Sequence, residues 1–250
     1  MRDALHEELA TMGQRHWWYR ARRLIVRVVL ATYLPPNPDR RVLEVGAGTG
    51  SVTTILSEFG TVTAVEPHSG ALEACRSAAP SAEVFQGDIE SLETLPAVTR
   101  APFDLVAAFD VIEHIQDDVD ALRRLRPLIA EGGRLVVTVP ALEMLWGAHD
   151  DVNGHFRRYS RAQLIRHLRL AGYETEFISY FSTLLFPVVV AVRLSRRFFA
   201  EPHPEPHSDF RLGPKPINDL LTWCFSLEAK IVRGHRLPIG SSLVAVARVV

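Results

Sequence analysis

The sequence predicts an α/β protein built on one open, mostly parallel sheet of seven strands, with helices on both faces. Short apolar runs of strand length alternate with longer amphipathic segments along most of the chain. The first run, Arg41–Val45, leads directly into a turn that contains Gly46, Gly48 and Gly50. Glu66 ends the next run, twenty residues after Gly46. A buried strand, a glycine turn and a later acid are typical of sheets that bind nucleotide-like ligands at their carboxyl edge.

The segment before the first strand, residues 1–36, predicts an amphipathic helix because large apolar residues recur at helical spacing after Trp17. Its arginines occupy the other faces of that helix, and a proline-rich stretch ends it. One interpretation is a helix packed on the domain with a solvated basic side. The other is a lid over the ligand cleft, formed by His16, Trp17, Trp18 and Tyr19.

The strands are expected where short apolar runs lie between turn-forming residues. They cover Arg41–Val45, Thr61–Val65, Glu83–Gln86, Phe103–Phe109, Leu135–Val139, Tyr173–Tyr180 and Ser242–Val249.

Helices are expected between these strands, over residues 51–59, 67–79, 117–130 and 160–172. Gly60 stops the first helix and Pro80 stops the second. The third has acids in its first turn and arginines near its end, as the helix dipole favours. Ser160 and Gln163 form a capping-box signature for the fourth. Residues 91–102 are expected to be irregular.

About sixty residues, 181–240, separate the last two strands. They contain an apolar run, Leu184–Phe199, a loop rich in proline and histidine, 200–216, and a second helical stretch, Ile217–Arg233. A sixth strand that runs parallel to the others ends at the ligand-binding edge. The insertion is therefore expected to emerge beside the ligand and to cap the substrate side.

The composition narrows the class of protein. The formal net charge is −1, so the overall charge gives no reason to expect nucleic acid as a partner. Two cysteines, Cys75 and Cys224, are too few for a disulfide framework and are expected to be reduced. The first residues lack the apolar core of a signal peptide, and no apolar run reaches the length of a bilayer. These features predict a cytoplasmic protein.

One apolar segment allows two interpretations. Phe181–Val192 is strongly apolar and is followed by Arg193, Arg196 and Arg197. In the first interpretation, residues 181–199 make a peripheral contact with a membrane surface. The alternative is a buried cap helix that lines an apolar pocket. The pocket is favoured because the run is too short to span a bilayer and little else indicates anchoring.

Four segments together resemble the class I S-adenosylmethionine-dependent methyltransferases. They are Glu44–Gly50, Glu66, Gly87–Asp88 and Asp110–His114. The resemblance is strongest to the small-molecule and quinone-type branch, which has a D-x-x-E-H segment after the fourth strand. It implies a Rossmann-like fold, S-adenosyl-L-methionine as the cofactor and methyl transfer to a small molecule.

The resemblance also divides the chain and assigns its cofactor residues. A single methyltransferase domain over 1–250 would consist of an N-terminal helical lid (1–36), a cofactor-binding core (40–180), a helical cap insertion (181–240) and the last strand (241–250). The methionine portion of the cofactor would contact Glu44, Gly46, Gly48 and Gly50, the ribose Glu66 with Pro67 beside it, the adenine Asp88 and Ile89, and the methionine end and substrate Phe109 and Asp110.

Methyl transfer to a hydroxyl needs a general base, because the acceptor is still protonated. The candidates are His114, His149 and His155, since imidazole titrates near neutral pH and all three follow strands that end at the ligand edge. His114 is expected chiefly to line the site, whereas the other two compete for the role of base. Each of these histidines could also be a structural residue.

The loop that holds two of these histidines, WGAHDDVNGHFRRYS, also has metal-ligand residue types at His149, Asp150, Asp151 and His155. No metal is expected, because two adjacent arginines would repel a cation. Substrate contacts are instead expected from Trp18, Tyr19, His114, Arg157, Arg158 and Tyr159. The two arginines could equally be surface charges beside a helix start.

The leading function is therefore methyl transfer to a hydroxyl on a small, apolar-bodied or lipid-like molecule. Methylation of nitrogen or sulfur, and a non-catalytic S-adenosylmethionine-binding module, are the alternatives. A nucleic-acid methyltransferase is disfavoured because no N-P-P-Y-type segment follows the fourth strand. A nicotinamide oxidoreductase would need a longer glycine spacing.

Overall fold

The computed structural model describes residues 16–95, 98, 102–198 and 214–250. Its seven strands form one sheet in the order β3-β2-β1-β4-β5-β7-β6. The strands are β1 (Arg41–Val45), β2 (Thr61–Glu66), β3 (Glu83–Gln86), β4 (Phe103–Phe109), β5 (Ile129–Pro140), β6 (Tyr173–Phe181) and β7 (Ser242–Val249). Within this sheet, β7 alone runs opposite to the other six strands, so the predicted seven-stranded, mostly parallel Rossmann-like sheet is confirmed.

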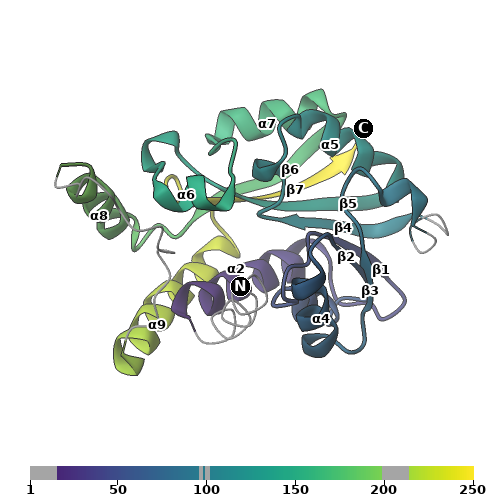
Figure 1. The fold of residues 1–250 in the computed structure, drawn as a ribbon, viewed down its shortest axis with the longest axis horizontal. Helices are drawn as coiled ribbons and strands as arrows, with labels where there is room; N and C mark the ends of the chain where they lie inside the picture. Colours follow the sequence, from purple (N-terminus) through teal and green to yellow (C-terminus); the bar gives the residue numbers. More distant parts are fainter. Residues whose placement is uncertain (1–15, 96–97, 99–101, 199–213) are drawn as a thin grey trace.

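Helices cover both faces of this sheet, as predicted. The α-helices are α2 (Trp17–Tyr33), α3 (Thr53–Leu56), α4 (Ser69–Ala78), α5 (Asp118–Leu125), α6 (Ala148–Asn153), α7 (Arg161–Leu170), α8 (Phe186–Phe198) and α9 (Lys215–Val232). Short 3₁₀ turns are η1 (Leu92–Thr94), η2 (Ile112–His114), η3 (Arg126–Leu128) and η4 (Glu143–Leu145). Figure 1 shows α5 and α7 on one side of the sheet and α2, α4 and α9 on the other.

The apolar runs form strands because both of their faces are buried between these helix layers. In β4, Leu105, Val106, Ala107 and Ala108 are all fully buried, which explains why the strand reads as a continuous apolar run rather than an alternating one. Because β7 is antiparallel to both β5 and β6, β6 itself runs parallel to β5. The insertion after β6 therefore starts at the carboxyl edge of the sheet, as expected.

Two predicted helices are wrong in extent. The segment after the glycine turn forms only the four-residue α3, and its backbone then tightens into turns with hydrogen bonds from Glu58 N to Ile55 O and from Phe59 N to Leu56 O. The apolar residues of this segment recur at helical spacing because one side of the helix and of the turns after it is buried. The helix predicted to reach Ala130 ends at Leu125, because Pro127 cannot donate a backbone hydrogen bond.

The strand that follows is consequently longer than predicted. β5 begins at Ile129, which pairs with Phe103, and Gly132 and Gly133 lie inside the strand. The register between β4 and β5 shifts at this point, between Phe103 and Leu105. The two glycines thus accommodate a bulge rather than a separate turn.

The N-terminal helix and the insertion pack on each other. The backbone N–H of Trp17 donates to Asn218 Oδ1 at 2.8 Å, and Arg20 pairs with Asp219 at 2.8 Å. The ring centroids of Trp17 and Phe225 lie 5.9 Å apart. Most of the loop predicted at 200–216 lies outside the described residues.

No helix among the described residues is long and apolar enough to cross a membrane. The predicted division of the single domain into lid, core and cap stays a prediction.

Candidate active site

A cavity of about 650 Å³ opens where β1, β2, β4 and β5 end. Its walls also include the start of α2, the loop around α6 and part of α8. The predicted residues on its lining are Glu44, Gly46, Gly48, Glu66, Phe109, Asp110, His114, His149, His155, Trp18, Tyr19 and Arg158. A volume of this size suits a small ligand.

The glycine turn is held on the cavity by the acid at the end of β2. Glu66 Oε2 accepts a hydrogen bond from the N–H of Gly48 at 2.8 Å, and Glu66 Oε1 accepts from the N–H of His68 at 3.0 Å. Gly46 adopts φ +72°, and a Cβ at this position would lie 2.4 Å from Val111 Cγ2. The turn therefore requires glycine for close packing. Gly50 serves the core rather than the cavity, because its missing side chain makes room for Cys75.

Glu44 is a buried carboxyl beside this turn. Its side chain lines the cavity, and Oε2 has no hydrogen-bond partner among the described residues. Burial raises the pKa of Glu44 to about 8. A cationic group that enters the cavity would supply the missing partner.

Replacing Glu44 with glutamine is expected to flatten the pH dependence of stability. In the wild type, the Glu44 carboxyl ionises near its ordinary pKa when the chain is unfolded but only near pH 8 when it is folded. Its contribution to the free energy of unfolding is therefore complete at low pH and is lost as the pH rises to about 8, by on the order of 1 kcal/mol per pH unit. Denaturant unfolding at pH 5, 6.5 and 8 measures this slope. The exposed Glu58→Gln serves as the control, and equal slopes for wild type and E44Q would contradict the prediction.

An arginine that the sequence interpretation placed on a solvated face lies inside the site. The Arg22 guanidinium pairs with Asp110 Oδ2 at 2.6 Å and donates to Thr138 Oγ1 at 3.2 Å. Asp110 has φ +55°, and Thr138 Oγ1 donates to its other oxygen at 2.9 Å. Arg22 thereby fixes the carboxylate that follows β4. The signal was present in the sequence, since Arg22 shares a helical stripe with Trp18 and Ile25.

His155, on the loop after β5, lines the cavity and is hydrogen-bonded to a buried acid behind it. His155 Nδ1 lies 2.8 Å from Asp150 Oδ1, and Arg158 Nε donates to the same oxygen at 2.9 Å. Burial alone would raise the pKa of Asp150, but the hydrogen bond from His155 and the charge of Arg158 lower it to about 2. Asp150 is therefore a permanent anion that orients the imidazole of His155.

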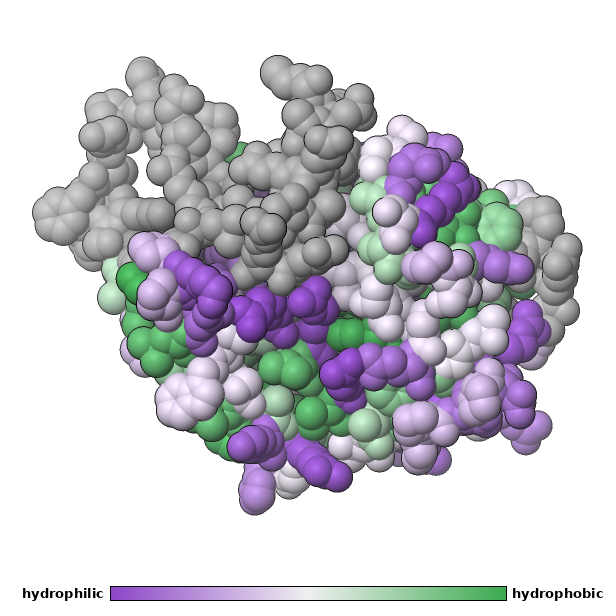
Figure 2. All heavy atoms as spheres, turned by 90° about the horizontal axis from the view of Figure 1, so that it is seen from below, coloured by the Kyte–Doolittle hydropathy of each residue, from purple (hydrophilic) through white to green (hydrophobic). Residues whose placement is uncertain are grey.

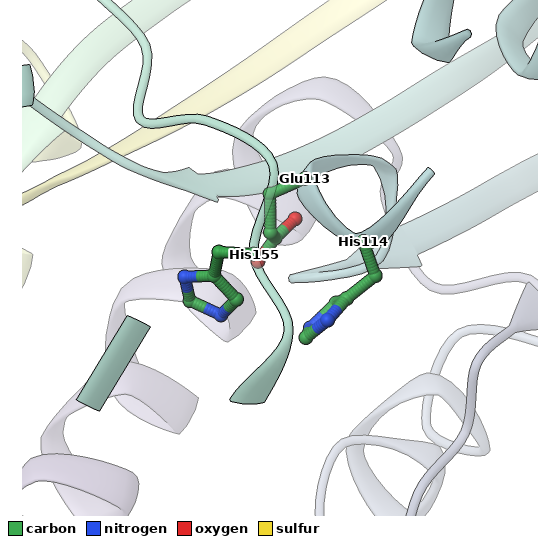
Figure 3. A group of neighbouring side chains, drawn as sticks. All are labelled: Glu113, His114 and His155. Carbon is green, nitrogen blue, oxygen red and sulfur yellow. The ribbon is translucent and has the colours of Figure 1, made fainter. Parts of the chain in front are cut away.

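Two further groups lie next to this pair (Figure 3). The rings of His114 and His155 stack edge to face with centroids 4.6 Å apart, and the Glu113 carboxyl points toward the same space. Both oxygens of Glu113 are buried without a hydrogen-bond partner among the described residues. Burial, and then the charge of Asp110, raise the pKa of Glu113, while burial and His155 lower the pKa of His114. The uncharged forms of Glu113 and His114 are thus favoured.

Glu113, His114 and His155 each offer one ligand atom, and these atoms lie within 4.8 Å of one another. Their types would suit a divalent ion. The four loop residues considered from the sequence do not form such a group among the described residues. Asp150 contacts His155 but also accepts from Arg158, and Asp151 accepts a hydrogen bond from the Trp146 indole. The absence of a required metal stays a prediction.

Several predicted site residues lie off the cavity lining. Asp88 accepts hydrogen bonds from the N–H groups of Glu90 and Ser91, which closes its own turn, and Ile89 is buried in the core. Pro67 is also absent from the lining. Tyr159 is fully buried and donates to Asp118 Oδ2 at 2.5 Å, and Arg157 pairs with the same carboxylate at 2.8 Å. These two side chains hold α5 against the loop before α7.

Comparison with known proteins agrees with this geometry. The model of the methyltransferase domain family matches residues 16–176. The chain belongs to this methyltransferase family. Its fold is that of the class I S-adenosylmethionine-dependent methyltransferases. Members of the family use S-adenosylmethionine as the methyl donor.

Individual relatives are distant. The chain is 32% identical over 105 residues to the ubiquinone biosynthesis O-methyltransferase of Xylella fastidiosa (strain 9a5c), a match that covers 41% of this chain and 43% of the relative. It is 29% identical over 114 residues to the trans-aconitate 2-methyltransferase of Rhizobium etli, which covers 44% and 43%. The curated relatives are thus matched over about two fifths of their length.

A chain of the solved complex between the Haloferax volcanii Trm112 methyltransferase activator and “the putative methyltransferase” superimposes with a TM-score of 0.61 at 15% identity. The superposition covers 99% of this chain and 96% of that one. At this identity the likeness concerns the fold alone.

The methyltransferase cavity has the features that S-adenosylmethionine needs. A Cβ at Gly48 would meet no atom within 4 Å, so the backbone there is open to a ligand. The orphaned oxygen of Glu44 would accept from the ammonium group of the amino-acid portion. Glu66 keeps one lone pair beyond its three contacts, with Gly48 and with the N–H and ring of His68, for a ribose hydroxyl.

Proposed function

We propose that this protein transfers the methyl group of S-adenosylmethionine to a hydroxyl on a small molecule with an apolar body. One observation carries the proposal: His155, which is hydrogen-bonded to the buried Asp150, lines the same cavity as the glycine turn. A turn suited to the cofactor and an oriented base for the acceptor thus share one space. The O-methyltransferase name of the Xylella fastidiosa relative supports the choice of oxygen.

Some residues of the site bind the cofactor and the acceptor, and others transfer the proton. S-adenosylmethionine supplies an activated methyl group when bound, so the protein has chiefly to align the acceptor with it. Gly46, Gly48, Glu44 and Glu66 hold the cofactor, and Asp110, fixed by Arg22, borders the acceptor. His155 Nε2 takes the proton of the acceptor hydroxyl. Asp150 keeps the other ring nitrogen protonated and stabilises the imidazolium that forms.

The walls of the cavity indicate the body of the acceptor. The lining also includes the aromatic and aliphatic side chains of Trp17, Trp18, Leu145, Val188 and Val189. Side chains of this kind favour binding of a flat or branched apolar group.

Calorimetry followed by an acceptor panel tests the proposed function. The purified chain is expected to bind S-adenosylmethionine and S-adenosylhomocysteine but not NAD. With phenols and long-chain alcohols it is expected to release S-adenosylhomocysteine in proportion to the methylated product. Amines and thiols of the same shape are the matched controls. Preferential turnover of those controls would overturn the oxygen assignment, and binding without turnover of any acceptor would indicate a non-catalytic module.

A further inference from the structure

We propose that α8 and α9 dock on an anionic lipid surface, and that an apolar acceptor enters the cavity from that surface. The docking element, here named the cap surface, consists of Leu184, Val188, Ile217, Leu220 and Trp223. It rests on the proposed function only for the nature of the acceptor, because attachment to lipid does not require turnover.

Exposed apolar side chains are concentrated in two segments of the described chain. The large apolar residues that are exposed are Met144, Val152, Phe156, Leu170, Leu184, Val188, Ile217, Leu220, Trp223, Ile231, Ile239 and Val250. All but Leu170 and Val250 belong either to the loop around α6 or to the insertion. Both segments leave the carboxyl edge of the sheet, where the cavity opens. A random scatter of exposed apolar residues would not be confined in this way.

The apolar residues of the insertion are strongly exposed to solvent. Val188, Leu220 and Trp223 retain 58%, 58% and 59% of their exposure, and Ile217 retains 53%. On α9, Ile217, Leu220 and Trp223 follow one another at a spacing of three residues, which places them along one side of the helix. Figure 2, a view from the side of α2 and α9, shows apolar atoms at the surface in its left half.

The charge of the insertion favours an anionic partner over a neutral one. The insertion, residues 181–240, contains eight Lys and Arg residues and five acids. Of these acids, Glu228 is fully buried, and Asp219 pairs with Arg20 and Lys215. The chain as a whole has a net charge of −1, so the basic excess is local. Basic residues beside an apolar helix face are the pattern of an interfacial helix on anionic lipid.

The position of α8 connects this surface to the cavity. In Figure 1, α8 projects from the body of the molecule at the same end as α9. Val188 is exposed, yet it lines the cavity together with Val189 and Arg193. Glu228 anchors the start of this segment, since its Oε1 accepts from the Leu184 N–H at 2.6 Å. The helix thus starts from a fixed point and presents apolar residues both to the outside and to the cavity.

Flotation of the full chain with vesicles tests the proposal. The chain is expected to float with vesicles that contain phosphatidylglycerol and phosphatidylcholine, and to float much less with phosphatidylcholine alone. High salt is expected to weaken the binding, because it screens the basic residues. The double variant Leu220→Asp with Trp223→Asp is expected to lower vesicle binding at least about tenfold.

Leu170→Asp is the matched control, since Leu170 is an equally exposed apolar residue at the end of α7 and lies outside the cap surface. It is expected to bind vesicles like the wild type. Absence of wild-type binding to anionic vesicles would overturn the proposal, as would equal losses in both variants. Self-association that the double variant abolishes, without vesicle binding, would identify a second copy as the partner. Binding of S-adenosylmethionine is measured in parallel, so that failure of the proposed function remains distinguishable.

Discussion

Replacing His155 with alanine is expected to lower kcat by about 10²- to 10⁴-fold, the usual contribution of a general base, with little change in affinity for S-adenosylmethionine. The reason is positional. His155 lies on the loop after β5, whereas the glycine turn follows β1, so the imidazole and the cofactor contacts come from different strands. Release of S-adenosylhomocysteine with the best hydroxyl acceptor measures kcat, and calorimetry measures cofactor affinity.

His149→Ala is the matched control, because His149 lines the same cavity and hydrogen-bonds Asn153. It is expected to lose far less activity than His155→Ala. A positioning role for Asp150 predicts that Asp150→Asn lowers kcat and also changes the shape of the pH–rate profile, which a purely structural loss would not do. Full turnover by the His155 variant would remove the base assignment, and equal losses at both histidines would reassign the effect to cavity shape.

The parts of the fold that depend on local patterns could be predicted from the sequence. β1, β4 and β7 have the predicted bounds, because a buried strand between two helix layers leaves an apolar run that few other structures share. Parallel strands place the residues that follow them at one edge of the sheet, and this rule correctly predicted that Gly48, Glu66 and His155 line one cavity.

The parts that depend on long-range packing could not be predicted. Tyr159 and Arg157 looked like substrate ligands from their residue types, but Asp118, some forty residues earlier, takes both of them. Asp88 has the residue type for an adenine contact, yet its carboxylate closes its own turn. Burial of Glu113 without a partner is a property of the whole cavity. Residue type and spacing carry no information about which partner a charged side chain finally meets.

A substitution at Gly48 tests where the cofactor binds. Comparison with Gly132 separates the effect of backbone strain from the loss of contact with the cofactor. Gly48 and Gly132 have φ +55° and φ +74°, and a Cβ at either position would meet no atom within 4 Å. Alanine at either site should therefore destabilise the fold by a similar amount, about 1 kcal/mol, through backbone strain alone. Only Gly48 lies on the cavity.

Gly48→Ala is accordingly expected to weaken S-adenosylmethionine binding by about 10- to 100-fold, because the added methyl group occupies space that the cofactor needs. Gly132→Ala is expected to bind the cofactor like the wild type. Calorimetry gives the two dissociation constants, and denaturant unfolding confirms that the two variants are equally stable. Unchanged affinity in Gly48→Ala would place the cofactor away from the glycine turn. Because the roles given to Glu44 and Glu66 assume a cofactor at that turn, they would then fail together with it.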